Sequence, residues 1–196
     1  MIVFVTAMLL LNITPGQDML YVIARSVAQG RAAGIASALG VGAGCFFHIF
    51  AVAFGVAELL RTVPVAYQAI RYAGAAYLIY LGVRMLLSKG VHEDAPVVQR
   101  ARLDRIFLQG AVTNILNPKV ALFFLAFLPQ FIDPQGSAFR QTVTLGLLFD
   151  ASGTLVNIAV ALAASKAGAF LPARMKYVTG GVFVALGLRL AIPERV

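Results

Sequence analysis

The residues best suited to bind a small polar molecule lie in the middle of an apolar stretch. Ile106–Phe131 is long and apolar enough to cross a membrane, yet it contains Asn114, Asn117, Pro118 and Lys119. Proline has no N–H and its ring crowds the carbonyl four residues earlier, so a helix is kinked or interrupted there. Backbone groups freed inside a membrane are tolerated only where protein, water or a ligand satisfies them. The sequence therefore predicts a binding site at this break.

A similar motif, Asn12 followed by Pro15 and Gly16, occurs in the first apolar stretch, and Asp18 lies about one helical turn beyond Pro15-Gly16. Freed amides of a restarted helix would lie close to this carboxylate. Asp18 could cap that helix, since aspartate accepts well from orphan N–H groups. It could equally contact the ammonium of a ligand or carry a proton, and both interpretations stay open.

Three further ionisable residues lie within apolar stretches, where charge is expensive and calls for an explanation. Lys119 could snorkel or pair with a carboxylate, but its mid-span position favours binding of an anionic group beside the amides of the second half-helix. Asp150 could load and release a proton, or form a static ion pair with Lys119. His48 could be a proton relay or simply a packing residue.

The composition indicates an integral membrane protein. Of the 196 residues 60% are apolar, against about 45–50% in ordinary soluble domains, and the mean hydropathy is +0.87. The net charge of +8 would suggest nucleic acid in a soluble protein. Here the basic residues lie mainly in short loops between apolar stretches, so we interpret them as topology signals and predict no nucleic-acid partner.

The sequence lacks the patterns of several enzyme classes. Cys45 is the only cysteine, so an internal disulfide is excluded. Two histidines and this cysteine stand at unrelated spacings, which predicts neither a metal site nor a metal cofactor. There is no glycine-rich phosphate loop and no nucleophile elbow. We therefore predict a protein without enzymatic activity or cofactor, whose energy for transport would come from an ion gradient.

The expected fold is all-α, with six transmembrane helices. Their predicted ranges are Ile2–Ala24, Ala36–Leu60, Val65–Leu87, Ile106–Phe131, Thr142–Ala164 and Leu171–Ile192. The polar stretch 88–105 divides the chain into two three-helix halves, 1–87 and 106–196. We interpret this stretch as a solvated cytoplasmic connector.

The two halves resemble each other. Pro15 and Pro118 lie 103 positions apart, and at a shift of 105 Arg71-Tyr72 falls on Lys176-Tyr177. An odd number of spans per repeat inverts the second copy in the membrane. Two inverted three-helix repeats, with the first and fourth helices broken at Pro15 and Pro118, fit the plan of many secondary transporters, which bind substrate at the midplane between broken helices.

The distribution of basic residues predicts the orientation. Ten lie in the loops after the first, third and fifth spans and five on the opposite side, so the connector should be cytoplasmic and both termini outside. Small residues line the second span, at Gly34, Gly40, Gly42 and Gly44. Small faces let helices approach closely, which favours helix packing; close approach to a moving partner or ligand is the alternative, and a homodimer is possible.

Two segments resemble the LysE/RhtB family of bacterial amino-acid exporters. The first is the run 12–20 (NITPGQDML) with the glycine-rich stretch that follows, and the second is 113–119 (TNILNPK) followed by 127–131 (FLPQF). The resemblance covers nearly the whole chain. It implies a multi-pass protein of the bacterial inner membrane that exports amino acids such as homoserine, threonine, leucine or lysine by proton antiport.

Other functions remain in competition with amino-acid export. Efflux of a metal cation or another small metabolite is a property of more distant relatives of that family, although soft or clustered ligands are scarce here. A membrane-embedded enzyme is disfavoured because no nucleophile–base or redox pair is visible. A non-transporting membrane subunit would gain nothing from charged residues beside two midspan breaks.

Overall fold

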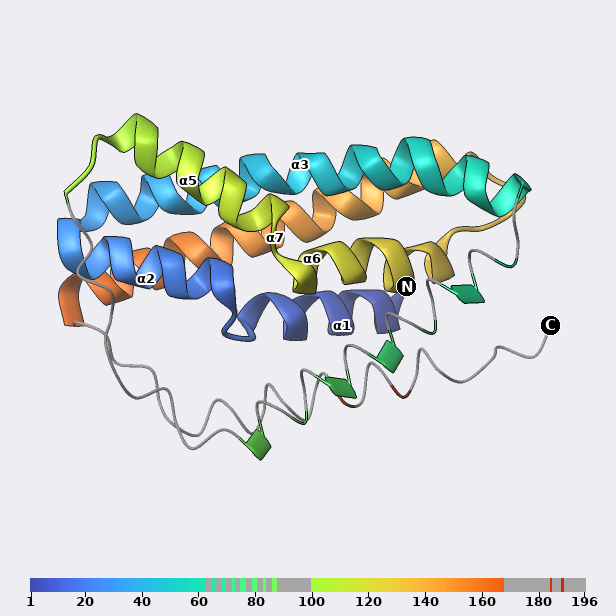
Figure 1. Cartoon of the computed structure of the whole chain (residues 1–196), viewed down its shortest axis with the longest axis horizontal. Helices are drawn as coiled ribbons and strands as arrows, with labels where there is room; N and C mark the ends of the chain where they lie inside the picture. The colour runs from blue at the N-terminus through green and yellow to red at the C-terminus, as the bar shows by residue number, and fades with distance from the viewer. Residues whose placement is uncertain are drawn as a thin grey trace.

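The structure, a computed structural model, describes residues 1–62 and 100–167 and isolated helical positions at 65–87, 184 and 188. Every regular element with assigned bounds in these parts is a helix (Figure 1). The elements are α1 (Ile2–Ile13), α2 (Gln17–Gln29), α3 (Arg31–Thr62), α5 (Leu103–Ile115), α6 (Pro118–Leu122), the π-helix η1 (Phe123–Phe127), the 3₁₀-helix η2 (Leu128–Phe131) and α7 (Ala138–Ala167).

Two of these helices, α3 and α7, are long and apolar enough to cross a membrane, over Arg31–Gly55 and Ala138–Lys166. The bent pairs α1–α2 and α5–η2 also qualify if each is counted as one span. The described helices thus correspond to the predicted first, second, fourth and fifth spans. The predicted third and sixth spans fall mainly outside the described residues, so the six-helix repeat stays a prediction.

The chain breaks at both predicted motifs. The bend is 41° between α1 and α2 and 46° between α5 and the helix that follows it. Thr14 is extended, as expected for a residue before proline, and Gly16 is the N-cap of α2. At the second break Pro118 does not interrupt a helix by a ring clash. It is the first residue of α6, where its missing N–H is not needed, and Asn117 is the N-cap.

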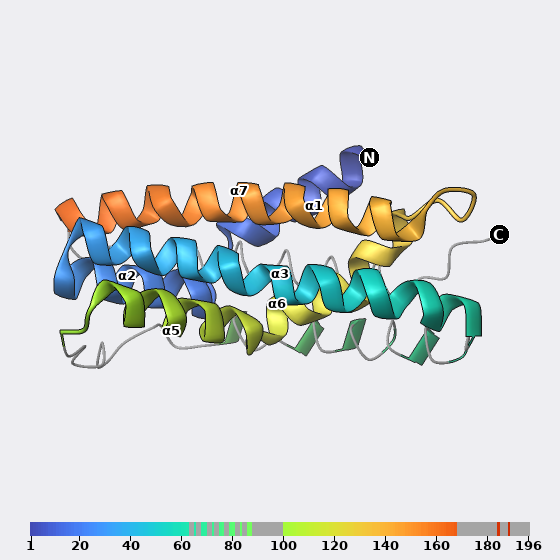
Figure 2. The same cartoon turned by 90° about the horizontal axis from the view of Figure 1, so that it is seen from above.

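The two halves run in opposite directions where the structure describes them. In Figures 1 and 2, α1 and α2 run against α5 and α6, and α3 runs against α7. This is the arrangement that an inverted repeat requires of its first two spans. The reversal from α2 into α3 occurs at Gly30, whose φ of 82° favours glycine.

The glycines of α3 let it lie close to α5 and α7. A Cβ at Gly40 would lie 2.1 Å from the carbonyl oxygen of Phe107, and a Cβ at Gly44 would lie 2.4 Å from that of Ala111, both on α5. On the α7 side, a Cβ at Gly42 would lie 2.6 Å from Thr154 Oγ1. The predicted role of these glycines in helix packing is confirmed.

The described helices bury aromatic side chains inside and expose others outside. Phe123, Phe124 and Phe127 of η1 are buried, and Phe123 stacks on Phe149 of α7 with ring centroids 4.4 Å apart. On the outer face of α3 an exposed row of phenylalanines consists of Phe46, Phe47, Phe50 and Phe54. A contiguous apolar row of this kind is uncommon on a soluble monomer and is expected on a helix that contacts lipid.

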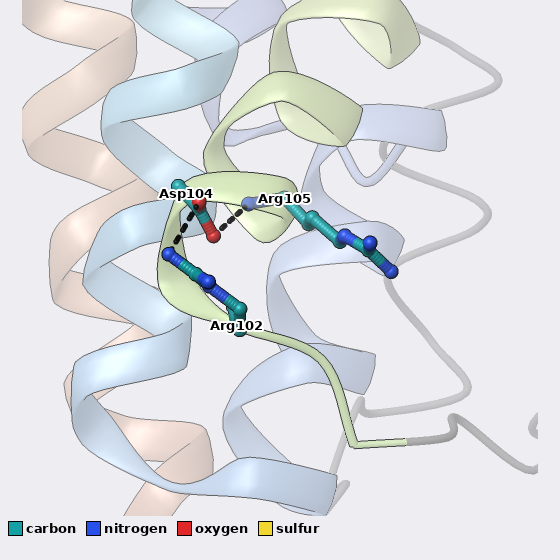
Figure 3. A network of polar contacts seen from close by, with 3 residues as sticks. All are labelled: Arg102, Asp104 and Arg105. Carbon is teal, nitrogen blue, oxygen red and sulfur yellow. Dashed lines mark hydrogen bonds and ion pairs between the residues drawn. The ribbon is translucent and has the colours of Figure 1, made fainter.

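The polar cluster at the start of α5 lies where the predicted connector ends (Figure 3). Arg102 Nη2 lies 3.2 Å from Asp104 Oδ2, and Asp104 Oδ1 accepts the backbone N–H of Arg105 at 2.9 Å. Both side chains of the ion pair are exposed, so it contributes little to stability. The helix begins at Leu103 rather than at the predicted Ile106.

Candidate functional site

A cavity of about 40 Å³ lies beside both helix breaks, which is room for about three water molecules. It is lined by all six α-helices of the described chain and by the loop between α1 and α2. The lining residues are Asn12, Thr14, Asp18, Met19, Val41, Cys45, Asn114, Lys119, Val120, Phe149, Asp150, Gly153, Thr154 and Asn157. Five of the predicted site residues (Asn12, Asp18, Asn114, Lys119 and Asp150) therefore meet in one place.

The ammonium of Lys119 contacts the first break rather than its own helix. Its Nζ donates to the carbonyl of Leu11 at 3.1 Å and to that of Thr14 at 3.0 Å. A cation is favoured there because the last carbonyls of a helix carry partial negative charge. An ammonium has three N–H donors, so these two bonds leave one for a molecule in the cavity.

Asp18 lies in the first turn of α2 and is buried. Its Oδ2 accepts the side-chain amide of Asn114 at 2.8 Å, while Oδ1 has no hydrogen-bond partner among the described residues. The N-cap of α2 is Gly16, and no side-chain cap bond is formed there. Of the two interpretations left open, the capping role is thus wrong, and the carboxylate keeps one oxygen free.

His48 is buried in α3 and hydrogen-bonds the carbonyl oxygen of Asn114 through Nε2 at 3.0 Å. A carbonyl can only accept, so Nε2 must carry a proton in this arrangement. The ring also stacks on Phe124, with centroids 5.9 Å apart. His48 does not line the cavity, and its contacts hold Asn114 and the end of α5 in place.

The two remaining asparagines have structural contacts that the sequence did not predict. Asn12 donates from Nδ2 to the carbonyl of Phe149 at 3.1 Å and to Ser152 Oγ at 2.8 Å, which joins α1 to α7. Asn117 accepts the backbone N–H of Lys119 through Oδ1 at 3.0 Å and so caps α6. Its Nδ2 is buried without a hydrogen-bond partner among the described residues.

Asp150 enters the cavity from α7, on the side opposite α2. Thr154 Oγ1 donates to its Oδ1 over a long 3.4 Å, and the thiol of Cys45 lies beside it. In the described part of the chain Asp150 has no ion pair, so the static pair with Lys119 is not formed. The carboxylate is half-buried and weakly bonded, which leaves it available to a proton or a ligand.

Two polar residues of α7 that line the cavity were missed from the sequence. Thr154 and Asn157 follow Asp150 at four and seven positions and therefore lie on the same face of α7. A polar stripe at this spacing inside an apolar span is readable from the sequence. Asn157 is buried and makes no hydrogen bond to the described residues.

One basic residue has a different place from the predicted one. The predicted first span ends at Ala24, which counts Arg25 among the basic residues of the following loop, but Arg25 lies buried in α2. Its Nη2 donates to Gln109 Oε1 of α5 at 2.6 Å, and Tyr21 OH donates to the carbonyl of Ile106 at 2.8 Å. These contacts join the two broken spans at one end of the bundle.

Two known proteins resemble this chain over nearly its full length, and a third resembles part of it. A homoserine/homoserine lactone efflux protein of Salmonella typhimurium is 30% identical over 187 residues, which is 93% of this chain and 91% of that protein. An uncharacterized membrane protein of Pseudomonas aeruginosa is 32% identical over 201 residues, 96% of this chain and 93% of that protein. A leucine efflux protein of Salmonella choleraesuis is 38% identical over 125 residues, 62% of this chain and 58% of that protein.

No solved structure matches the chain significantly. The family of the LysE type translocators matches residues 9–194, which include both helix breaks and every residue of the cavity. The match covers the chain from the first predicted span to the last. The chain therefore belongs to the LysE type translocator family, whose members are translocators rather than enzymes.

Proposed function

We propose that this protein exports amino acids from the bacterial cytoplasm in exchange for protons, and that the substrate binds in the cavity beside the two helix breaks. One observation carries the proposal. A cation (Lys119) and two carboxylates that make no ion pair with it (Asp18 and Asp150) border the same cavity in an otherwise apolar bundle. An amino acid carries the complementary pair of charges.

Each end of the substrate has a candidate partner. The N–H of Lys119 that Leu11 and Thr14 leave unused would bind the substrate carboxylate. The free Oδ1 of Asp18 would accept from its ammonium. Asp150, across the cavity and held only by a long hydrogen bond, is the residue that would carry the counter-proton.

The cavity is too small for an amino acid in this conformation. Binding of an amino acid would therefore require the cavity to widen, which separation of the two halves would achieve. Alternating access by rocking of the repeats around the site is the motion that such folds use. The end where Arg25 contacts Gln109 is the side we assign to the cytoplasm, since the basic start of α5 lies there too.

Efflux from preloaded cells tests the proposal. Cells with and without the protein are loaded with amino acids supplied as dipeptides, and the loss of each amino acid is followed with and without a protonophore. We expect faster, uncoupler-sensitive loss of particular amino acids, with homoserine and leucine tested first because two relatives are named for their efflux. No difference over a broad panel, with the protein shown in the membrane, would contradict amino-acid export, and metal-sensitivity growth tests would follow.

Variants test the assignment of residues. Asp150→Asn and Lys119→Met should both abolish efflux while the protein still inserts. Asp104→Asn and Lys166→Met are matched controls, because both residues are exposed and distant from the cavity lining. If Asp150→Asn and Lys119→Met both export normally, these residues have no part in transport.

A further inference from the structure

The carbonyl end of α1 is bound by an ammonium from the other half of the chain. Leu11 and Thr14 each accept a hydrogen bond from Lys119 Nζ, at 3.1 and 3.0 Å, across 108 and 105 positions of sequence. Pro15 has no N–H to donate to the Leu11 carbonyl four residues earlier, which otherwise accepts the Thr14 N–H at 3.2 Å. Without Lys119 these two carbonyl oxygens would lose a charged partner at membrane depth.

The surroundings of this ammonium favour any small monovalent cation. The end of a helix carries about half a negative charge, and the carboxylate of Asp18 lies near enough to act on Lys119 electrostatically. Gly16 leaves the space open, because a Cβ there would lie 3.1 Å from Nζ. Carbonyls at the ends of broken helices are also the groups that coordinate free cations in other transporter folds.

We propose that the Leu11 and Thr14 carbonyls form a binding site for a monovalent cation, and that the tethered ammonium of Lys119 occupies it in place of a dissociable ion. This inference rests on the geometry of the break and adds a second role for Lys119 to the proposed function. Transport would then need no free sodium or potassium. Removal of the lysine side chain would open a site that an external cation can fill.

The Lys119→Ala variant provides the test. Alanine keeps Cβ, so the substitution deletes three carbon atoms (Cγ, Cδ and Cε) and the Nζ ammonium. Propylammonium reproduces them. The variant is purified in detergent, and its thermal unfolding is followed by circular dichroism during titration with propylammonium chloride. We expect a lower apparent Tm than in the unmodified protein, and a saturable rise as propylammonium binds the folded state. Propanol and choline chloride at equal concentration should give no such rise.

Two further variants separate site binding from a general salt effect. Lys119→Met keeps a side chain of similar length, so the space stays filled and propylammonium should have no effect. Lys166→Ala removes an exposed lysine at the end of α7 and should behave like the unmodified protein. An equal shift in all variants, or no shift in Lys119→Ala, would overturn the proposal.

The readout is stability, so it is independent of amino-acid export. If the export experiment fails and the titration succeeds, only the proposed function is contradicted, and the proposed cation site stands. If Lys119→Ala does not accumulate as folded protein, it is expressed and purified in propylammonium throughout. Folded protein recovered with propylammonium and not with propanol supports the site, and no recovery with either rejects it.

Discussion

Close packing of α3 on α5 makes Gly40→Ala a sharp perturbation. The new Cβ would lie 2.1 Å from the carbonyl oxygen of Phe107, so the backbones must separate by more than 1 Å to reach an ordinary contact of about 3.4 Å. The clash is with backbone, which cannot rotate away, so the upper end of about 3 kcal/mol for overpacking applies. Alanine regains about 1 kcal/mol of helix propensity, and about 2 kcal/mol of destabilisation remains.

In a protein of this size that loss corresponds to a fall of about 4–8 °C in Tm. Cys45 supplies the assay, because it is the only cysteine and is buried, so a thiol-reactive dye reports its exposure on unfolding. Gly55→Ala is the matched control on the same helix, since nothing lies within 4 Å of a Cβ there. Equal Tm values for Gly40→Ala and Gly55→Ala would refute the close approach of α3 and α5.

Three smaller changes test other contacts. Asn12→Ala removes two hydrogen bonds to α7 at about 0.5–1.5 kcal/mol each, while Ser152 Oγ still donates to the Phe149 carbonyl, so we expect about 1–3 kcal/mol of destabilisation in the same melt. Gln109→Ala removes the acceptor of a charge-assisted bond from Arg25 and should cost about 1.5–3 kcal/mol; an unchanged Tm would show that the contact contributes nothing. His48→Gln keeps a donor for the Asn114 carbonyl and should retain efflux and its pH profile, whereas His48→Leu should lose efflux; a shifted profile in His48→Gln would instead indicate a proton relay.

The breaks could be predicted from the sequence because their causes are local. Proline at positions 15 and 118 determines the neighbouring backbone whatever packs around it. Asn117 before Pro118 is also the usual pairing of an N-cap with a proline at the first helical position, so its capping role was readable. The polar stripe of Asp150, Thr154 and Asn157 follows from helical periodicity alone.

The partner of Lys119 could not be predicted in the same way. Its ammonium was expected beside the amides of its own second half-helix, but it binds carbonyls more than 100 positions away. Only the packing of α6 against α1 brings these groups together, and no local pattern encodes that packing. Arg25 was misplaced for a related reason, because hydropathy does not distinguish a loop from the last turns of a helix whose polar side chains contact another helix.

Each helix break provides hydrogen-bond partners for polar groups at the other break. Lys119, after the second break, bonds the carbonyls before Pro15, while Asn114, before the second break, bonds Asp18 after the first. The cavity in this conformation therefore depends on contacts that cross between the halves. In the proposed mechanism, rocking of the halves would break these contacts inside an apolar bundle, where an unpaired polar group is expensive. A zwitterionic substrate would offer a new partner to one side of each contact, since its carboxylate suits Lys119 and its ammonium suits Asp18. Binding of substrate and opening of the cavity would then be coupled, and an analogue that lacks either charge should fail to be exported even if it fits.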